Sequence, residues 1–384
     1  MEEKQINNNI PENPKKKSHK KLISNLIFLT LLTVLVVILL LSMGEINKIG
    51  ESLANIGQNY IWLIAAIGLV LAYFILWPFS QCIYGKALKI KASFGESFLI
   101  GSSEHFYNGI TPFAAGGQPF QIYSYTKRKV TTAQATGVIL ASFVTFMMVT
   151  NAFAIVSLFF WQDIWNGLTT LNMQWVIWVA LVGFIINFSV LLFMIALGTN
   201  KHIRNLLVKL LTKLANWKIF HNEKHKLLNR FGNFLVNQIP NFELYCSNAQ
   251  IAFKQVWSHK LATVLAIIIK IICMACYYAI PFFLLKAVGI DIGFDKIPLV
   301  LFATSFAITS VVWMPTPGGT GGIEFAFQFV IAAVIGMSVK EDATAVCLLW
   351  RLVTFYLVII ISFILNAVFE AIASRRMKKE EQNV

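Results

Sequence analysis

The feature that most limits what this chain can fold into is a series of apolar runs, each long enough to cross a lipid bilayer. A helix of about 20 residues spans the hydrocarbon core, which is roughly 30 Å thick. The run from Leu22 to Met43 contains no charged residue. By the same criterion we predict six full crossings, at 22–43, 60–80, 133–161, 175–198, 261–285 and 342–369.

Composition excludes a soluble enzyme. Hydrophobic residues make up 57% of the chain and charged residues only 13%, whereas soluble domains carry about 25% charged residues. The formal net charge is nevertheless +14. The basic residues do not gather on a long polar domain, so we expect no nucleic-acid partner. The predicted fold class is an all-α polytopic membrane protein.

Two apolar regions are interrupted, and we predict that each forms a broken, re-entrant helical hairpin. The first, 94–126, contains Pro and Gly residues between Asn108 and Gln121, and the second, 297–338, contains them between Pro315 and Gly322. Pro and Gly at this density cannot continue a helix. Unpaired backbone at membrane depth is tolerated only where protein buries it or it lines a wet cavity.

Positive charge along the chain predicts the topology, because short cytoplasmic loops carry the excess of Lys and Arg. With the N-terminus inside, the outer side receives few of the 32 basic residues: Lys48, Lys286, Lys296 and Lys340. We therefore predict a multi-pass protein of the bacterial cytoplasmic membrane with both termini in the cytoplasm. The first hairpin then enters from the cytoplasm and the second from outside, which is typical of transporters with inverted repeats.

The domain boundaries follow from the polar segments. We expect a disordered basic tail at 1–20, a transmembrane domain at 21–372 and a charged cytoplasmic tail at 373–384. The domain includes a basic cytoplasmic loop at 199–260, where apolar residues from Ile203 to Leu214 recur at helical spacing. This amphipathic helix either lies on an anionic leaflet or packs on the cytoplasmic ends of the spans.

Few ionisable residues lie at membrane depth, where charge is costly and usually faces a cavity or a partner. Glu324 directly follows the second glycine-rich tip. It either caps a helix or pairs with Arg351 or Lys270, or else it contacts a cationic headgroup or exchanges partners during transport. Lys270 and Arg351 lie within apolar spans. With Lys127 and Arg128, they either line a positive path for a phosphate or pair with the acidic residues Glu104 and Glu324.

Motifs of hydrolytic or nucleotide-dependent chemistry are missing from the sequence, which has no G-x-S-x-G, H-E-x-x-H or P-loop. We therefore expect no cofactor, no metal and no catalytic residue. Cys273 and Cys276 form a C-x-x-C within a lipid-length span. We interpret them as inert core thiols.

Two motifs give the chain a family resemblance. Pro112 to Gln121, with Gly116-Gly117-Gln118-Pro119, is followed by Lys127-Arg128-Lys129, and the second motif is Pro315-x-Pro317-Gly318-Gly319-x-Gly321-x-x-Glu324. These stretches resemble the integral membrane domain of the lysylphosphatidylglycerol synthase and flippase family. The resemblance implies a domain that moves a lipid between leaflets. Family members with both halves also carry a soluble domain that transfers lysine from its tRNA to phosphatidylglycerol.

The chain ends about 15 residues after its last predicted span, so we expect the translocating half alone. The leading hypothesis is translocation of an anionic or aminoacylated phospholipid, or a related glycolipid. Two alternatives remain: a phosphatidylglycerol lysyltransferase or its membrane subunit, linked to cationic-peptide resistance, and a non-transporting scaffold for cell-envelope glycosyltransferases. Expected partners are the membrane lipid, a separately encoded lipid-modifying enzyme and a second copy in a homodimer.

The predicted substrate-binding residues come from the two tips, the basic segment after the first tip and the charged positions within spans. They are Asn108, Thr111, Gly116, Gly117, Gln118, Gln121, Lys127, Arg128, Lys270, Gly318, Gly319, Gly321, Gly322, Glu324 and Arg351.

Overall fold

The computed structural model describes residues 53–111, 114–217, 226–311, 313–314, 316–336 and 342–382, with isolated positions before residue 53. All regular elements in these ranges are helices, as the fold-class prediction requires. The predicted tail at 1–20 and the predicted span at 22–43 lie outside the described residues.

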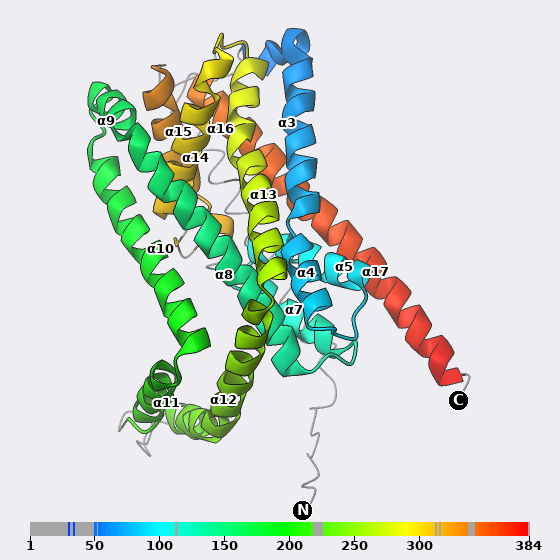
Figure 1. Cartoon of the computed structure of the whole chain (residues 1–384). Coiled ribbons are helices and arrows are strands. Elements are labelled where there is room, and N and C mark those ends of the chain that lie inside the picture. Colours follow the sequence, from blue (N-terminus) through cyan, green and yellow to red (C-terminus); the bar gives the residue numbers. More distant parts are fainter. Residues whose placement is uncertain are drawn as a thin grey trace, which may run out of the picture.

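Seven helical stretches of the described ranges are long and apolar enough to cross a membrane. Five of them confirm predicted crossings: Ile56–Ala87, Thr132–Thr170, Trp175–Thr199, Lys260–Ala287 and Asp342–Phe369. The other two are the arms of the second predicted hairpin, Phe294–Val311 and Pro317–Ile335. The chain is thus a multi-pass membrane protein (Figure 1).

The first half of the bundle contains a broken helix followed by a hairpin. Helix α3 (Ile56–Leu76) ends before Pro78, which cannot donate a backbone hydrogen bond, and α4 (Phe79–Ala87) continues beyond it. The hairpin begins with α5 (Phe94–Ser102), whose first turn is closed by a capping box between Ser93 and Glu96. It continues through α6 (Glu104–Gly109) and returns as α7 (Gly117–Thr126).

The second half repeats this order of elements. Helix α13 (Lys260–Ala287) leads into a hairpin formed by α14 (Ile297–Val311) and α15 (Gly322–Ile335). Helix α14 has 15 residues, and with the short turn before it the stretch Phe294–Val311 has the 18 residues that place it among the candidate crossings. The chain then runs through α16 (Asp342–Arg351), a π-helical turn η6 (Leu352–Tyr356) and α17 (Leu357–Gln382).

The two halves are inverted relative to each other. The first hairpin starts at the end of the bundle where α4 ends, and the second starts at the opposite end, where α13 ends (Figure 1). Helix α8 (Thr132–Ser157), which follows the first hairpin, packs on α14 of the second. Helix α17, which follows the second hairpin, packs on α5 and α6 of the first. The two hairpins therefore enter the bundle from opposite ends, as the sequence predicted.

Helices α9 (Trp161–Thr170) and α10 (Trp175–Thr199) hold the second hairpin at very short range. A Cβ atom on Gly167 of α9 would lie 2.1 Å from the backbone oxygen of Ala333. A Cβ atom on Gly183 of α10 would lie 2.1 Å from the backbone oxygen of Ser310. Small residues that let backbones approach in this way are the usual basis of helix packing in membranes.

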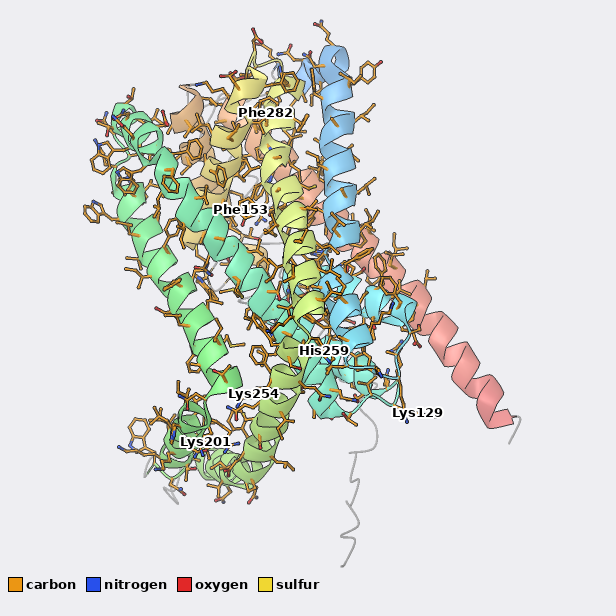
Figure 2. All side chains as sticks on the ribbon, in the orientation of Figure 1. Lys129, Phe153, Lys201, Lys254, His259 and Phe282 are labelled. Atoms are coloured by element: carbon orange, nitrogen blue, oxygen red, sulfur yellow. The ribbon has the colours of Figure 1, made fainter. Side chains whose placement is uncertain are left out.

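Helices α11 (Lys201–Ala215) and α12 (Lys226–Ser258) lie in the polar loop and pack against each other. Leu206, Leu210 and Leu214 on α11 stay about half exposed. Lys129, Lys201 and Lys254 all lie at one end of the bundle, and Phe282 lies near the other (Figure 2). The basic loops predicted to share one side of the membrane therefore share one end of the molecule.

Candidate functional site

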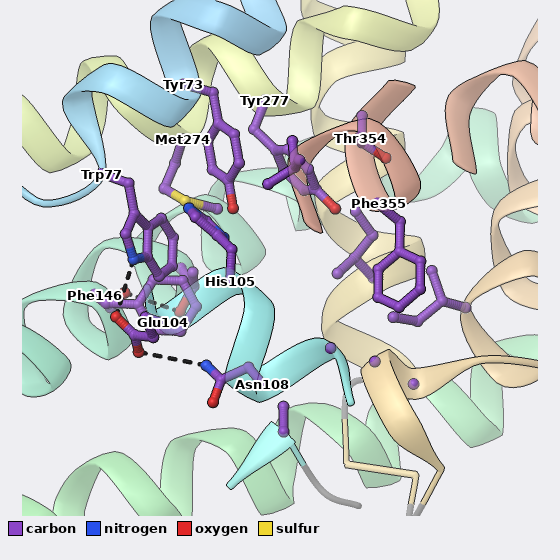
Figure 3. A pocket seen from close by; sticks show the side chains of 18 of the residues that line it. Tyr73, Trp77, Glu104, His105, Asn108, Phe146, Met274, Tyr277, Thr354 and Phe355 are labelled. Atoms are coloured by element: carbon purple, nitrogen blue, oxygen red, sulfur yellow. Dashed lines mark hydrogen bonds between the residues drawn. The ribbon is translucent and has the colours of Figure 1, made fainter. Parts of the chain in front are cut away.

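Both hairpin tips meet at one central cavity of about 260 Å³. The first tip contributes Gly109, Ala114 and Gln118, and the second contributes Gly318 and Gly319. Figure 3 shows the wall formed by α3, α6, α13 and the turn after α16. This volume is near the lower end of the roughly 300–1,000 Å³ typical of small-molecule sites. It offers room for a polar headgroup and not for a whole lipid.

Side chains from α6 and from Thr111 just after it hold the turn of the first tip together. The Asn108 amide donates to Glu104 Oε1 at 3.4 Å, and its oxygen accepts the Gly117 N–H at 2.8 Å. Thr111 Oγ1 accepts the Gly116 N–H at 2.9 Å. These bonds satisfy backbone donors at the start of α7 that have no partner within the helix. Asn108 and Gln118 line the cavity, whereas Thr111, Gly116 and Gly117 shape the turn beside it.

Glycines at left-handed backbone angles build the second tip. Gly318 has φ +59° and Gly321 has φ +97°, and the N–H of Gly321 donates to Glu324 Oε2 at 2.7 Å. Left-handed angles favour glycine because they crowd the Cβ atom of other residues. Gly318 and Gly319 line the cavity, but Gly321, Gly322 and Glu324 are not part of its wall.

Arg351 and Glu324 form a buried ion pair behind the second tip. Arg351 Nη2 also donates to the Gly318 carbonyl and to Thr320 Oγ1, each at 3.2 Å. The guanidinium lies 4.4 Å from the centre of the Phe355 ring. Arg351 itself lines the cavity, so one face of its side chain is neutralised by Glu324 while another faces the space where a ligand would sit.

Lys270 does not line the central cavity. Its ammonium donates to the Trp77 carbonyl at 2.9 Å and lies 4.0 Å from the centre of the Trp77 ring. This carbonyl is at the C-terminal end of α3, where the helix dipole attracts a cation. Within the described part of the chain, no direct ion pair joins Lys270 to Glu104. Lys270 thus stabilises the break between α3 and α4.

A second, much smaller pocket of about 10 Å³ adjoins the cavity. Lys270, Gln81 and Gln121 line only this side pocket, whereas Glu104, Trp77 and Gln118 line both spaces. Glu104 accepts hydrogen bonds from Trp77 Nε1 at 3.0 Å and from Gln121 Nε2 at 3.3 Å. The carboxylate of Glu104 is therefore held between the two spaces.

Lys127 and Arg128 lie away from both spaces, although the sequence predicted them on the path of a phosphate. Lys127 is exposed, with its ammonium 4.6 Å from the centre of the Tyr123 ring. Arg128 donates to the Ser124 carbonyl at 2.7 Å and lies 3.6 Å from Glu96. Lys127 and Arg128 therefore lie at the base of the first hairpin, where the contacts of Arg128 stabilise it.

An aromatic wall was missed by the sequence reasoning. Tyr73, Trp77, His105, Phe146 and Tyr277 line the cavity, and their rings pack together with centroids 4.7 to 5.5 Å apart. These residues come from α3, α6, α8 and α13, so their proximity depends on tertiary packing. His105 lies among these rings, against Tyr73 and Trp77.

These features define a multi-pass α-helical membrane protein in which two opposed, broken hairpins meet at a central cavity lined mainly by apolar and aromatic side chains, with a few polar groups among them. The family model described as "Lysylphosphatidylglycerol synthase TM region" matches residues 26–362, and the chain belongs to this family. The chain is also similar to a "UPF0104 membrane protein" of Archaeoglobus fulgidus, at 22% identity over 312 residues. That alignment covers 78% of this chain and 83% of the relative. No solved structure matches the chain.

Proposed function

We propose that this protein moves the polar headgroup of a membrane lipid between the leaflets of the bacterial cytoplasmic membrane. The observation that carries the proposal is the meeting of two hairpin tips, which enter from opposite ends of the bundle, at one cavity. Transporters place their substrate sites at such junctions of broken helices, and alternating access follows from rocking one half against the other. The acyl chains would stay in the lipid.

Arg351 supports a lipid with a phosphate group as the substrate. Its Nε and Nη2 atoms donate to Glu324, Gly318 and Thr320, while Nη1 makes no hydrogen bond to any residue described in the structure. A guanidinium presents five donors in a planar fork that suits phosphate oxygens. We therefore propose an anionic or aminoacylated phospholipid, or a phosphate-linked glycolipid, with Arg351 on the phosphate and Asn108 and Gln118 on the rest of the headgroup.

Leaflet exchange in reconstituted vesicles tests this function. Purified full-length protein in liposomes is supplied with fluorescent phosphatidylglycerol, its lysylated form or a phosphate-linked glycolipid, and a membrane-impermeant reductant reports the outer leaflet. We expect at least one of these lipids to exchange several-fold faster than in empty vesicles. Arg351→Lys keeps the charge but loses the fork, and should slow exchange. Equal rates in protein-containing and empty vesicles for all three lipids would exclude the function.

A second assay with the same purified protein distinguishes lipid translocation from the alternative function, lysyl transfer. It is incubated with lysyl-tRNA and phosphatidylglycerol, and the lipids are analysed by mass spectrometry. We expect no lysylated product. A lysylated product that is missing in the Arg351→Lys variant would favour phosphatidylglycerol lysyltransferase activity instead.

A further inference from the structure

Two buried amide groups in the side pocket beside the cavity each have an oxygen without a hydrogen-bond donor in the described part of the chain. Gln81 is 2% exposed and Gln121 fully buried, and the amide oxygens of both accept no hydrogen bond from any described residue. The orientation of the Gln121 amide is fixed. Its nitrogen faces three acceptors, the carbonyls of Ile100 and Gly101 and the carboxylate of Glu104, at 3.3 to 3.4 Å. Exchanging its oxygen and nitrogen would therefore place oxygen against oxygen.

The Lys270 ammonium lines the same pocket and has donors beyond the one that it uses. An ammonium has three N–H groups, and only the Trp77 carbonyl accepts from Lys270 among the described residues. The pocket of about 10 Å³ has room for about one water molecule. A single water that accepts from Lys270 and donates to Gln81 and Gln121 would give both amide oxygens a donor and Lys270 a second acceptor.

Glu104 connects this side pocket with the central cavity, because it lines both. Its two oxygens accept from Trp77, Gln121 and Asn108. Through these bonds, a change in the charge of the carboxylate would alter contacts with α3, with α7 and with the first tip. Ionisable groups between a water-accessible space and a buried partner are typical of proton sites in transporters.

We propose that the side pocket is a proton-coupling site, in which Glu104 takes up and releases one proton for each lipid headgroup carried. This proposal rests on the proposed function. In the uptake step, a hydronium ion in the central cavity gives its proton to a Glu104 oxygen and leaves as water. In the release step, water on the other side of the membrane receives that proton.

A metal cation is a poor fit because Lys270 already occupies the cation position at the C-terminal end of α3. Other titratable or charged groups face Glu104 and Lys270: Tyr73 on α3, His105 on α6, Cys273 on α13, and Arg351 across the cavity. The elements that carry Gln81, Gln118, Gln121 and Ser142 contribute only neutral side chains to the side pocket. His105 is therefore the main rival for the proton.

Infrared difference spectra between alkaline and acidic pH test proton uptake without any lipid substrate. The purified full-length chain should show the C=O band of a buried protonated carboxyl group, and Glu104→Gln should lack it. His105→Gln and Glu96→Gln should keep the band, the latter because Glu96 is a partly exposed glutamate on the same hairpin. Identical difference spectra for wild type and Glu104→Gln would overturn the proposal.

Vesicles with a pH gradient test coupling to the lipid, with the membrane potential held at zero by potassium and valinomycin. A gradient of one pH unit should shift the equilibrium distribution of the carried lipid between leaflets about tenfold for one proton per lipid. In Glu104→Gln the ratio should stay near one, whereas Glu96→Gln, at a partly exposed glutamate on the same hairpin, should show the wild-type ratio. A wild-type response in Glu104→Gln would refute coupling at Glu104. If the wild type moves no lipid, the proposed function fails, and the infrared spectra still decide proton uptake.

Discussion

Gly318 lies so close to Phe355 that a methyl group on Gly318 would be 2.2 Å from the phenyl ring. The ring follows Arg351 in the π-helical turn and lines the cavity with Gly318. Glycine is required there both because of this contact and because of its φ of +59°. The second tip and the π-helical turn are therefore fitted to each other across the cavity wall.

Gly318→Ala should slow lipid exchange strongly by pushing the Phe355 ring into the cavity. Gly318→Ala combined with Phe355→Ala should recover a large part of the rate, measured by the vesicle assay. The control is Gly336→Ala, where φ is +66° and a Cβ atom would meet nothing within 4 Å. This control carries a similar backbone cost of about 1–2 kcal/mol without the collision. Equal loss in Gly336→Ala would show that backbone strain, and not the ring, is responsible.

Removing one partner of the Glu324–Arg351 pair should destabilise the protein more than removing both. Arg351→Met leaves a buried carboxylate without its partner, at a cost of about 3–5 kcal/mol, whereas neutral replacements of a whole pair are often tolerated. We expect a lower melting temperature for Arg351→Met than for Arg351→Met with Glu324→Gln. Thermal unfolding in detergent micelles measures the difference. A double variant less stable than the single one would contradict the argument.

Cysteine labelling should reveal the orientation of the bundle. Lys129→Cys and Lys201→Cys lie at the end that the charge distribution predicts to be cytoplasmic. Lys296→Cys precedes α14 at the other end. We expect a membrane-impermeant maleimide to label residue 296 in intact cells, and residues 129 and 201 only after permeabilisation. The native cysteines are buried or half-buried, so the unchanged chain serves as the control. The reverse pattern would invert the proposed topology.

Helix α11 should rest on a lipid surface through its leucines. Leu206, Leu210 and Leu214 are exposed although they form the apolar stripe of a basic helix. A nitroxide label at Leu210→Cys should be accessible to oxygen dissolved in lipid, and one at Lys209→Cys to a water-soluble relaxant. Electron paramagnetic resonance in vesicles that contain anionic lipid measures both. Equal water accessibility at the two positions would show that this stripe does not contact lipid.

Much of this architecture could be predicted because local chemistry determined it. The Pro and Gly residues at the two tips break helices wherever they occur, so both hairpins were visible in the sequence. The pairing of Glu324 with Arg351 was also an anticipated arrangement, since both charges lie at membrane depth. The five predicted crossings within the described residues depended only on length and hydropathy.

The contacts of Arg128 and Lys270 could not be predicted, because they depend on packing between elements that are distant in the sequence. Sequence position alone does not show that Arg128 turns toward Glu96 and Phe369, away from the cavity. Nor does it show that Lys270 meets the Trp77 carbonyl, 193 residues away. The one available signal was Pro78 inside an apolar run, because a break there exposes carbonyls that need a donor.

The backbone contacts of Gly167 with Ala333 and of Gly183 with Ser310 have a mechanical consequence. Surfaces that touch without intervening side chains slide poorly past each other, because they have no rotamers to rearrange. The second hairpin should therefore move as one body with α9 and α10. The first hairpin, together with α4 beyond the Pro78 break, would be the other moving part. Any opening of the cavity would then occur along the seam between these two bodies.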